Sequence, residues 1–175
     1  MKKIVLTFGL ISGVVLCGLM LLTVAFVERI GFDRGVIVGY TTMVLAFLFV
    51  FFGIRSYREN VGGGAISFGR AFTVGILIML ITCVMYVVTW QFEYRTFFPD
   101  FMDKYAAHVI EKARAEGASA EEITRQTEEL KSFKEMYANP FYNVLFTIME
   151  PLPVGLVMTL ISAAILRRRP RQQPA

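Results

Sequence analysis

Long uncharged stretches dominate this chain and separate short segments that carry nearly all of its charge. The apolar stretches lie at residues 4–27, 35–54, 71–92 and 141–166, and only the last contains a charged residue, Glu150. A helix needs about 20 apolar residues to cross the hydrocarbon core of a bilayer, so each stretch is long enough. The pattern predicts an all-α polytopic membrane protein with four transmembrane helices.

Composition agrees with this prediction, because 55% of the residues are hydrophobic and only 18% are charged. A soluble domain of this size has a more even balance. The first stretch follows Lys2 and Lys3, as in a cleaved signal peptide. It is longer than the apolar region of about 7–15 residues in such peptides. We therefore expect it to remain in the protein as the first span.

The polar segment 96–140 carries the periodicity of two amphipathic helices. Apolar positions of the first helix share one face: Phe101, Met102, Tyr105, Val109, Ile110 and Ala113. Those of the second helix, which ends before Asn139-Pro140, are Ile123, Thr127, Leu130, Phe133 and Tyr137. Between them, Gly117 suits a helix C-terminus, and Ser119 with Glu122 forms a capping box.

The expected product of this segment is an αα-hairpin. Its apolar faces either pack onto the protein's own bundle, which we favour, or bind a partner. The chain is thus expected to divide into residues 1–95 with three spans, 96–140 with the hairpin, and 141–175 with the fourth span and a basic tail.

Lys and Arg are distributed unevenly among the polar segments. The N-terminus, the loop between the second and third spans, and the C-terminal tail together hold nine basic residues and one acid, Glu59. The segment 93–140 holds ten acids and seven bases. By the positive-inside rule both termini lie in the cytoplasm and the hairpin is extracytoplasmic. The net charge of +4 therefore reflects topology and gives no evidence for nucleic-acid binding.

Small residues recur at four-residue spacing in the spans. The pairs are Gly9 with Gly13, Gly35 with Gly39, and Ala71 with Gly75. Small residues at this spacing let helix backbones approach closely in lipid. The sequence leaves open whether these contacts form within one chain or between copies of it.

Glu150, followed by Pro151 and Pro153, interrupts the fourth apolar stretch. Counting back from Arg167 at 1.5 Å per residue places Glu150 roughly 25 Å from the cytoplasmic edge. Because the hydrocarbon core is about 30 Å thick, Glu150 is expected about 5 Å inside the outer edge. Proline is favoured in the first turn of a helix, so the stretch predicts a helix start or a kink.

Two roles of Glu150 remain open. It caps the last helix or pairs with Arg34 or Arg95, with Tyr94 as a third candidate, which is the interpretation we favour. Alternatively it binds a proton or an ion, as carboxylates inside membranes often do.

No group of residues indicates catalysis, a cofactor or a metal site. His108 is the single histidine, so no Cys/His cluster is available to a metal. The glycine-rich residues 61–65 lack the Lys-Ser/Thr of a phosphate-binding loop. The preceding "YREN" could bind a lipid headgroup through Arg58, together with Arg55, and Asn60 in the same block is a further candidate functional or structural residue.

Several blocks of the chain resemble the bacterial membrane family called domain of unknown function 4199 (DUF4199). They are "GIRSYREN" (53–60), "GAISFGRAFTVG" (64–75), "PDF" (99–101), "YANP" (137–140) and "FTIMEPLPVGLVMTLISAAILRRR" (146–169). The resemblance implies a four-span protein of the bacterial inner membrane with a helical insert before the last span. It brings no activity.

Two functional hypotheses follow. The first is a non-enzymatic structural or partner-binding envelope protein, whose hairpin or spans engage another envelope protein or a second copy in the lipid bilayer. The alternative is an ion- or proton-coupled transporter subunit that uses Glu150, since a proline-broken helix marks many transporter sites.

Overall fold

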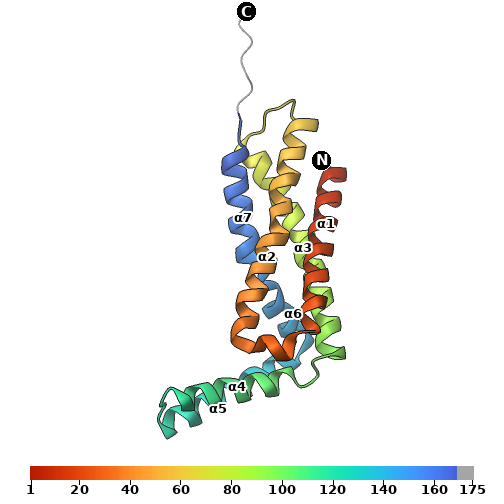
Figure 1. Ribbon diagram of the computed structural model, residues 1–175. Helices are drawn as coiled ribbons and strands as arrows, with labels where there is room; N and C mark the ends of the chain where they lie inside the picture. The colour runs from red at the N-terminus through yellow and green to blue at the C-terminus, as the bar shows by residue number, and fades with distance from the viewer. Residues whose placement is uncertain (169–175) are drawn as a thin grey trace, which may run out of the picture.

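The computed structural model describes residues 1–168. Within these residues the secondary structure consists of α-helices, and no β-strand is formed. Four helices stand side by side as a bundle (Figure 1): α1 (Lys2–Val24), α2 (Val27–Asn60), α3 (Phe68–Thr96) and α7 (Pro151–Leu166). Three more connect α3 to α7: α4 (Phe101–Ala115), α5 (Ala120–Ala138) and α6 (Pro140–Met149). The start of α1 and the end of α7 lie at the same end of the bundle. The tail beyond, with Arg169 and Arg171, lies outside the described residues.

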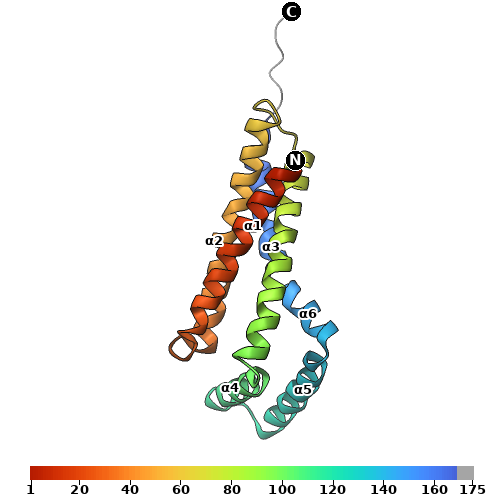
Figure 2. The same ribbon diagram turned by 90° about the vertical axis from the view of Figure 1, so that its right-hand side faces the viewer.

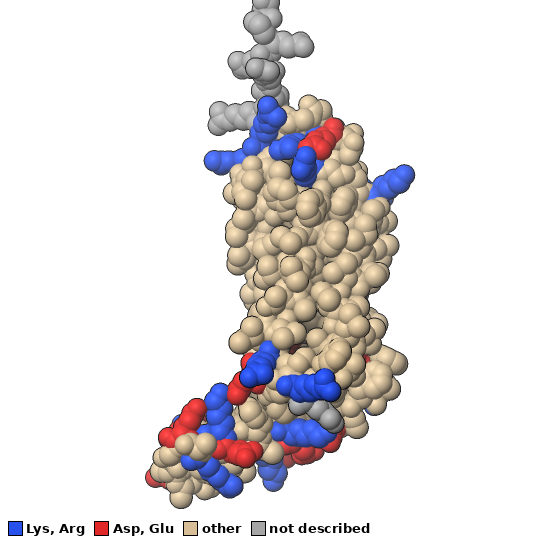
Figure 3. All heavy atoms as spheres, in the orientation of Figure 1, with Lys and Arg blue, Asp and Glu red and all other residues tan. Residues whose placement is uncertain are grey.

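Within residues 1–168, four helical segments are long and apolar enough to cross a membrane, as the sequence predicts. They are Lys2–Val24, Arg29–Asn60, Phe68–Thr96 and Pro140–Leu166. On the face that Figure 3 shows, charged side chains gather at the two ends of the molecule and leave an uncharged belt between them. Apolar side chains such as Ile37 and Ile165 are 68% and 65% exposed on the bundle. Such exposure suits contact with lipid, and the chain is an all-α polytopic membrane protein.

The interior of the bundle is filled by apolar side chains and by close helix contacts at glycine. Phe47, Leu16 and Ile78 are fully buried. A Cβ atom added at Gly75 would lie 2.6 Å from Cγ2 of Thr159 on α7. The small-residue pair Ala71 and Gly75 therefore serves close packing of α3 against α7 of the same chain.

The other predicted small-residue pairs differ from one another. A Cβ atom at Gly9 or Gly13 would come within 3 Å of a side chain of α3. Gly35 and Gly39 meet nothing within 4 Å. Helix packing within the chain therefore accounts for Gly9 and Gly13, whereas Gly35 and Gly39 lie on a face of α2 that no helix covers.

The second and fourth spans depart from their predicted bounds. Helix α2 runs over Val27–Asn60, beyond the predicted 35–54, with a break at Gly31, whose φ is +67°. The apolar stretch marks only the part inside the hydrocarbon, and the helix continues with polar residues on both sides. The fourth span, predicted as 141–166, is divided between α6 and α7, and Glu150 lies at the junction.

Helices α4 and α5 form the predicted hairpin. Gly117 has a φ of +85° just after the C-cap of α4, and the hydroxyl of Ser119 accepts a hydrogen bond from the Glu122 backbone N–H at 3.2 Å. These two features confirm the predicted turn. Figure 1 shows the hairpin projecting sideways from one end of the bundle, opposite the end where α1 begins.

Candidate functional site

The carboxylate of Glu150 accepts a hydrogen bond from the Tyr86 hydroxyl of α3, with 2.5 Å between the two oxygens. Tyr86 is buried, whereas Glu150 as a whole residue is exposed at the surface of the bundle. The predicted cap is wrong: Glu150 occupies the N-cap position of α7, but its side chain makes no capping hydrogen bond. Its backbone is helical, with φ −73° and ψ −56°, whereas capping side chains need an extended backbone.

Arg34 and Arg95 do not pair with Glu150, and this expectation is also corrected. Both are exposed, and neither forms an ion pair within residues 1–168. Arg34 lines a 460 Å³ cavity beside the start of α2. The third candidate, Tyr94, packs its ring 5.5 Å from that of Tyr137. Tyr86 on α3 is thus the partner of Glu150 in place of the three predicted residues.

The two prolines act at the start of α7. Pro151 is the first residue of the helix and is buried, while Pro153 is exposed in the same turn. Backbone N–H groups of a first helical turn have no partner within the helix, so proline loses nothing there. The chain changes direction at this point, and Figure 2 shows α6 leaning away from the bundle.

A set of buried and half-buried polar side chains, which we call the junction network, joins α3, α5 and α6. Gln91 Nε2 donates to Asn143 Oδ1 at 2.5 Å, and the Thr147 hydroxyl donates to the Asn143 carbonyl at 2.7 Å. Trp90 Nε1 donates to the Tyr137 hydroxyl at 2.8 Å. Burial raises the pKa of the Tyr137 phenol, so this hydroxyl stays protonated at neutral pH.

Sequence reasoning missed the junction network, although it left a weak signal. Asn143 and Thr147 are four residues apart on α6, and Trp90 follows Tyr86 by four on α3. Residues at this spacing share one helix face. Polar residues on one face of an otherwise apolar helix indicate a polar contact, but the spacing does not reveal which helix supplies the partner.

Glu93 is the second acid near this site, and the sequence placed it among the loop residues. It belongs to α3, where it is 3% exposed and its Oε1 atom has no hydrogen-bond partner within residues 1–168. Two helical turns separate it from Tyr86, so both side chains lie on the same face of α3. A buried carboxylate without a partner is costly when it is charged.

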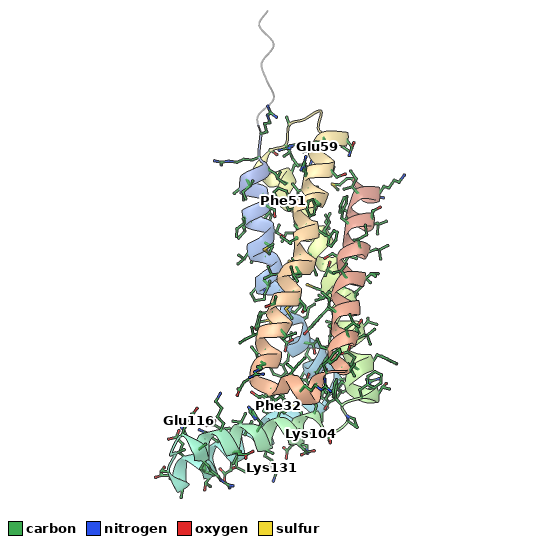
Figure 4. All side chains as sticks on the ribbon, viewed as in Figure 1. Phe32, Phe51, Glu59, Lys104, Glu116 and Lys131 are labelled. Atoms are coloured by element: carbon green, nitrogen blue, oxygen red, sulfur yellow. The ribbon has the colours of Figure 1, made fainter. Side chains whose placement is uncertain are left out.

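Contacts with the start of α2 hold the base of the hairpin. The ring of Phe32 lies 5.8 Å from the rings of Phe101 and Tyr105, and 5.2 Å from that of His108. Figure 4 labels Phe32 where the bundle meets α4. Asp33 accepts a hydrogen bond from Lys112 at 3.0 Å, which raises the pKa of that lysine. The single histidine is therefore a packing residue of this junction.

At the opposite end, the predicted headgroup ligands Arg55 and Arg58 and the further candidate Asn60 all have partners within the chain. Arg58 donates to the carbonyl of Leu166 at 3.4 Å and so contacts the end of α7. Asn60 donates to the Ser56 carbonyl of its own helix at 3.0 Å. Arg58 and Arg55 both bind Glu59, the acid labelled at this end in Figure 4.

Comparison with known protein families gives one match over residues 7–168, to the family described as Protein of unknown function (DUF4199). The match covers nearly all of the described residues. Neither the curated proteins nor the solved structures contain a match to this chain.

Proposed function

Because this chain belongs to the DUF4199 family, whose description assigns no activity, we propose its function from its own structure. The protein is a non-enzymatic, membrane-embedded envelope protein that presents the α4–α5 hairpin to a partner protein at one face of the membrane. The bundle anchors the hairpin, and the junction network fixes the base from which it projects.

Incomplete burial of the hairpin supports this proposal most strongly. Within α4 and α5 only Met102 and Tyr137 are buried. Farther along the hairpin, Ile110, Ile123 and Leu130 are half-buried although their helices already face each other. A pair of short helices buries too little apolar surface to be stable alone. A partner on this surface would complete the burial.

The distribution of charge supports an orientation with the termini in the cytoplasm, in the bacterial inner membrane that the resemblance to DUF4199 implies. The end of the bundle where α1 begins carries the basic residues Lys2, Lys3, Arg58 and Arg70, and its acid is Glu59. Basic residues are retained on the cytoplasmic side during insertion. The hairpin is then extracytoplasmic, and its partner is another envelope protein or a second copy of this chain. Neither end is proposed to bind nucleic acid.

Site-specific photocrosslinking in native membranes tests the proposal. A photoreactive residue replaces Ile110 on the half-buried face, and a matched control replaces Val88, which is 64% exposed on the bundle. We expect a discrete protein product from position 110 and lipid products from position 88. A product of twice the chain's mass identifies a second copy as the partner. The same products from both positions, or none from position 110, would contradict the proposal.

A second candidate function rests on the two acids near Tyr86. Glu93 is buried, with no hydrogen-bond partner for its Oε1 atom within residues 1–168, and Glu150 lies at the bundle surface with its carboxylate on Tyr86. Two carboxyl groups near one phenol, of which only that of Glu150 is hydrogen-bonded to it, could bind and release protons, as in an ion- or proton-coupled transporter subunit. Proton flux into liposomes that is lost in stable Glu93→Gln and Glu150→Gln variants would support it. An absence of proton flux into liposomes that contain the wild-type protein would contradict this second function.

A further inference from the structure

The basic end of the bundle contains a cleft that neither the hairpin nor the junction network uses. The cleft has a volume of about 700 Å³ and lies between the α2–α3 loop and the end of α7. Its walls come from both segments: Gly62, Ala65, Ile66, Ser67, Phe68, Arg167 and Arg168.

Backbone hydrogen bonds fix the two walls against each other. Ile66 and Arg168 form an antiparallel bridge, with N···O distances of 3.0 and 2.9 Å. Within the loop, the Ala65 N–H donates to the Gly62 carbonyl at 3.1 Å. The bridge uses only the backbone of Arg168, so its guanidinium group remains available to a ligand.

Positive charge is concentrated at this cleft and is poorly compensated. Neither Arg167 nor Arg168 forms an ion pair within residues 1–168. The nearby acid, Glu59, already binds Arg55 and Arg58. Guanidinium groups bind phosphate oxygens with two parallel hydrogen bonds, which makes arginine the preferred residue for such anions.

One wall of the cleft is apolar. Phe68 is 40% exposed, and its ring stacks on that of Phe72 with 6.2 Å between centroids. Phe72 follows one turn along α3, so the two rings extend from the cleft along the apolar surface of the bundle. A ligand with a phosphate group and a hydrocarbon chain would contact both parts of this surface.

We propose that this cleft binds a phosphate-bearing anion, with Arg167 and Arg168 on the phosphate. The phosphate can belong to the headgroup of an anionic phospholipid or to a free phosphate. The aromatic wall fits the phospholipid.

Native mass spectrometry of the full chain in detergent tests the site. The probes are short-chain phosphatidic acid, short-chain phosphatidylcholine and inorganic phosphate. We expect phosphatidic acid to bind tightly and phosphatidylcholine weakly. The double substitution Arg167→Gln, Arg168→Gln should weaken phosphatidic acid binding about tenfold, because charge-assisted hydrogen bonds are lost. Binding of inorganic phosphate as tight as that of phosphatidic acid would identify free phosphate as the ligand.

The matched control is Lys2→Gln, Lys3→Gln, which removes the same charge from the same end but lies outside the cleft. It should change binding less than about twofold, since the loss is only of long-range attraction. An equal loss in both double variants would overturn the proposal, as would unchanged binding in the arginine variant. If the double variant does not fold, Arg167→Gln alone, compared with Lys2→Gln alone, gives the same test with one charge removed from each.

Discussion

The bundle and the hairpin both consist of helices packed face to face, but they are held together differently. In the bundle, fully buried side chains such as Phe47 and Leu16 fill the interior, and Gly75 lets α3 approach α7 closely. In the hairpin, the two buried residues, Met102 and Tyr137, lie near the bundle. Close packing of side chains along the whole interface holds the bundle together, whereas a few contacts near the bundle hold the hairpin.

This difference suggests that local stability falls from the bundle toward the hairpin turn. Regions with few buried apolar contacts open at a lower free energy than the core of the same protein. The junction network lies between the two regions, so its hydrogen bonds set how firmly the hairpin is attached. Binding surfaces that order only against a partner are drawn from such less stable regions.

The largest expected effect concerns the side of the membrane that each region faces. We expect a cysteine replacing Ala118, in the hairpin turn, to react with an impermeant thiol reagent in intact cells. A cysteine replacing Val61, which is 52% exposed in the α2–α3 loop, should react only after permeabilisation. The unsubstituted chain, with Cys17 and Cys83 inside the spans, is the control. Labelling of Val61→Cys alone would reverse the proposed orientation.

Next in size is a steric test of the bundle. In Gly75→Leu the new Cβ atom would lie 2.6 Å from Thr159 Cγ2 and 3.0 Å from Ile54 Cδ1. Overpacking of this kind lowers the free energy of unfolding by about 1–3 kcal/mol. Gly39→Leu meets nothing within 4 Å and should have a small effect. Unfolding in mixed micelles measures both variants, and equal destabilisation would show that α3 and α7 are not in close contact.

An effect of similar size is expected at the junction network. Asn143→Leu removes the partner of Gln91 and leaves its amide unsatisfied, which costs about 1–3 kcal/mol. Adding Gln91→Leu should recover part of this loss, because neither polar partner then remains. Asn60→Ala, which loses only two exposed hydrogen bonds to Ser56 within α2, is the control. Strictly additive effects of the two leucines would show that Gln91 and Asn143 do not interact.

The smallest effect is expected in the hairpin. Leu130→Asp places a carboxylate on the half-buried face and should destabilise the hairpin by about 1 kcal/mol, with earlier proteolytic cleavage. The neighbouring change Glu129→Lys alters an exposed residue and should leave the cleavage rate unchanged. Equal cleavage of both variants would indicate that the apolar faces of α4 and α5 do not pack together.

Features determined by local sequence could be predicted, and those determined by helix rotation could not. The four spans follow from apolar length alone, and the hairpin turn follows from Gly117 and Ser119. The partner of Glu150 depends on which face α3 turns toward α7. Periodicity alone does not specify that rotation, so the sequence predicts Arg34, Arg95 or Tyr94 as the partner, whereas the structure has Tyr86.

Errors at the ends of elements have a related cause. Glu93 follows the apolar stretch and resembles a loop residue, yet α3 continues to Thr96 and buries it. The charged residues near Asp33 likewise belong to α2. The length of an apolar stretch indicates only the part of a helix that crosses the hydrocarbon. Helices α2 and α3 continue beyond their apolar stretches, and their polar residues there contact the hairpin.

The arrangement of helices has a consequence for biosynthesis. Helices α2 and α3 pack against α1 on one side and against α7 on the other. The ribosome completes α1, α2 and α3 before it makes the hairpin. The face of α3 that includes Gly75 and Met79 therefore stays uncovered until Thr159 and Gly155 of α7 are made. Insertion of α7 is therefore the closing step of assembly. A nascent chain stalled within the hairpin would expose this uncovered face of α3 to lipid and to membrane quality-control proteases.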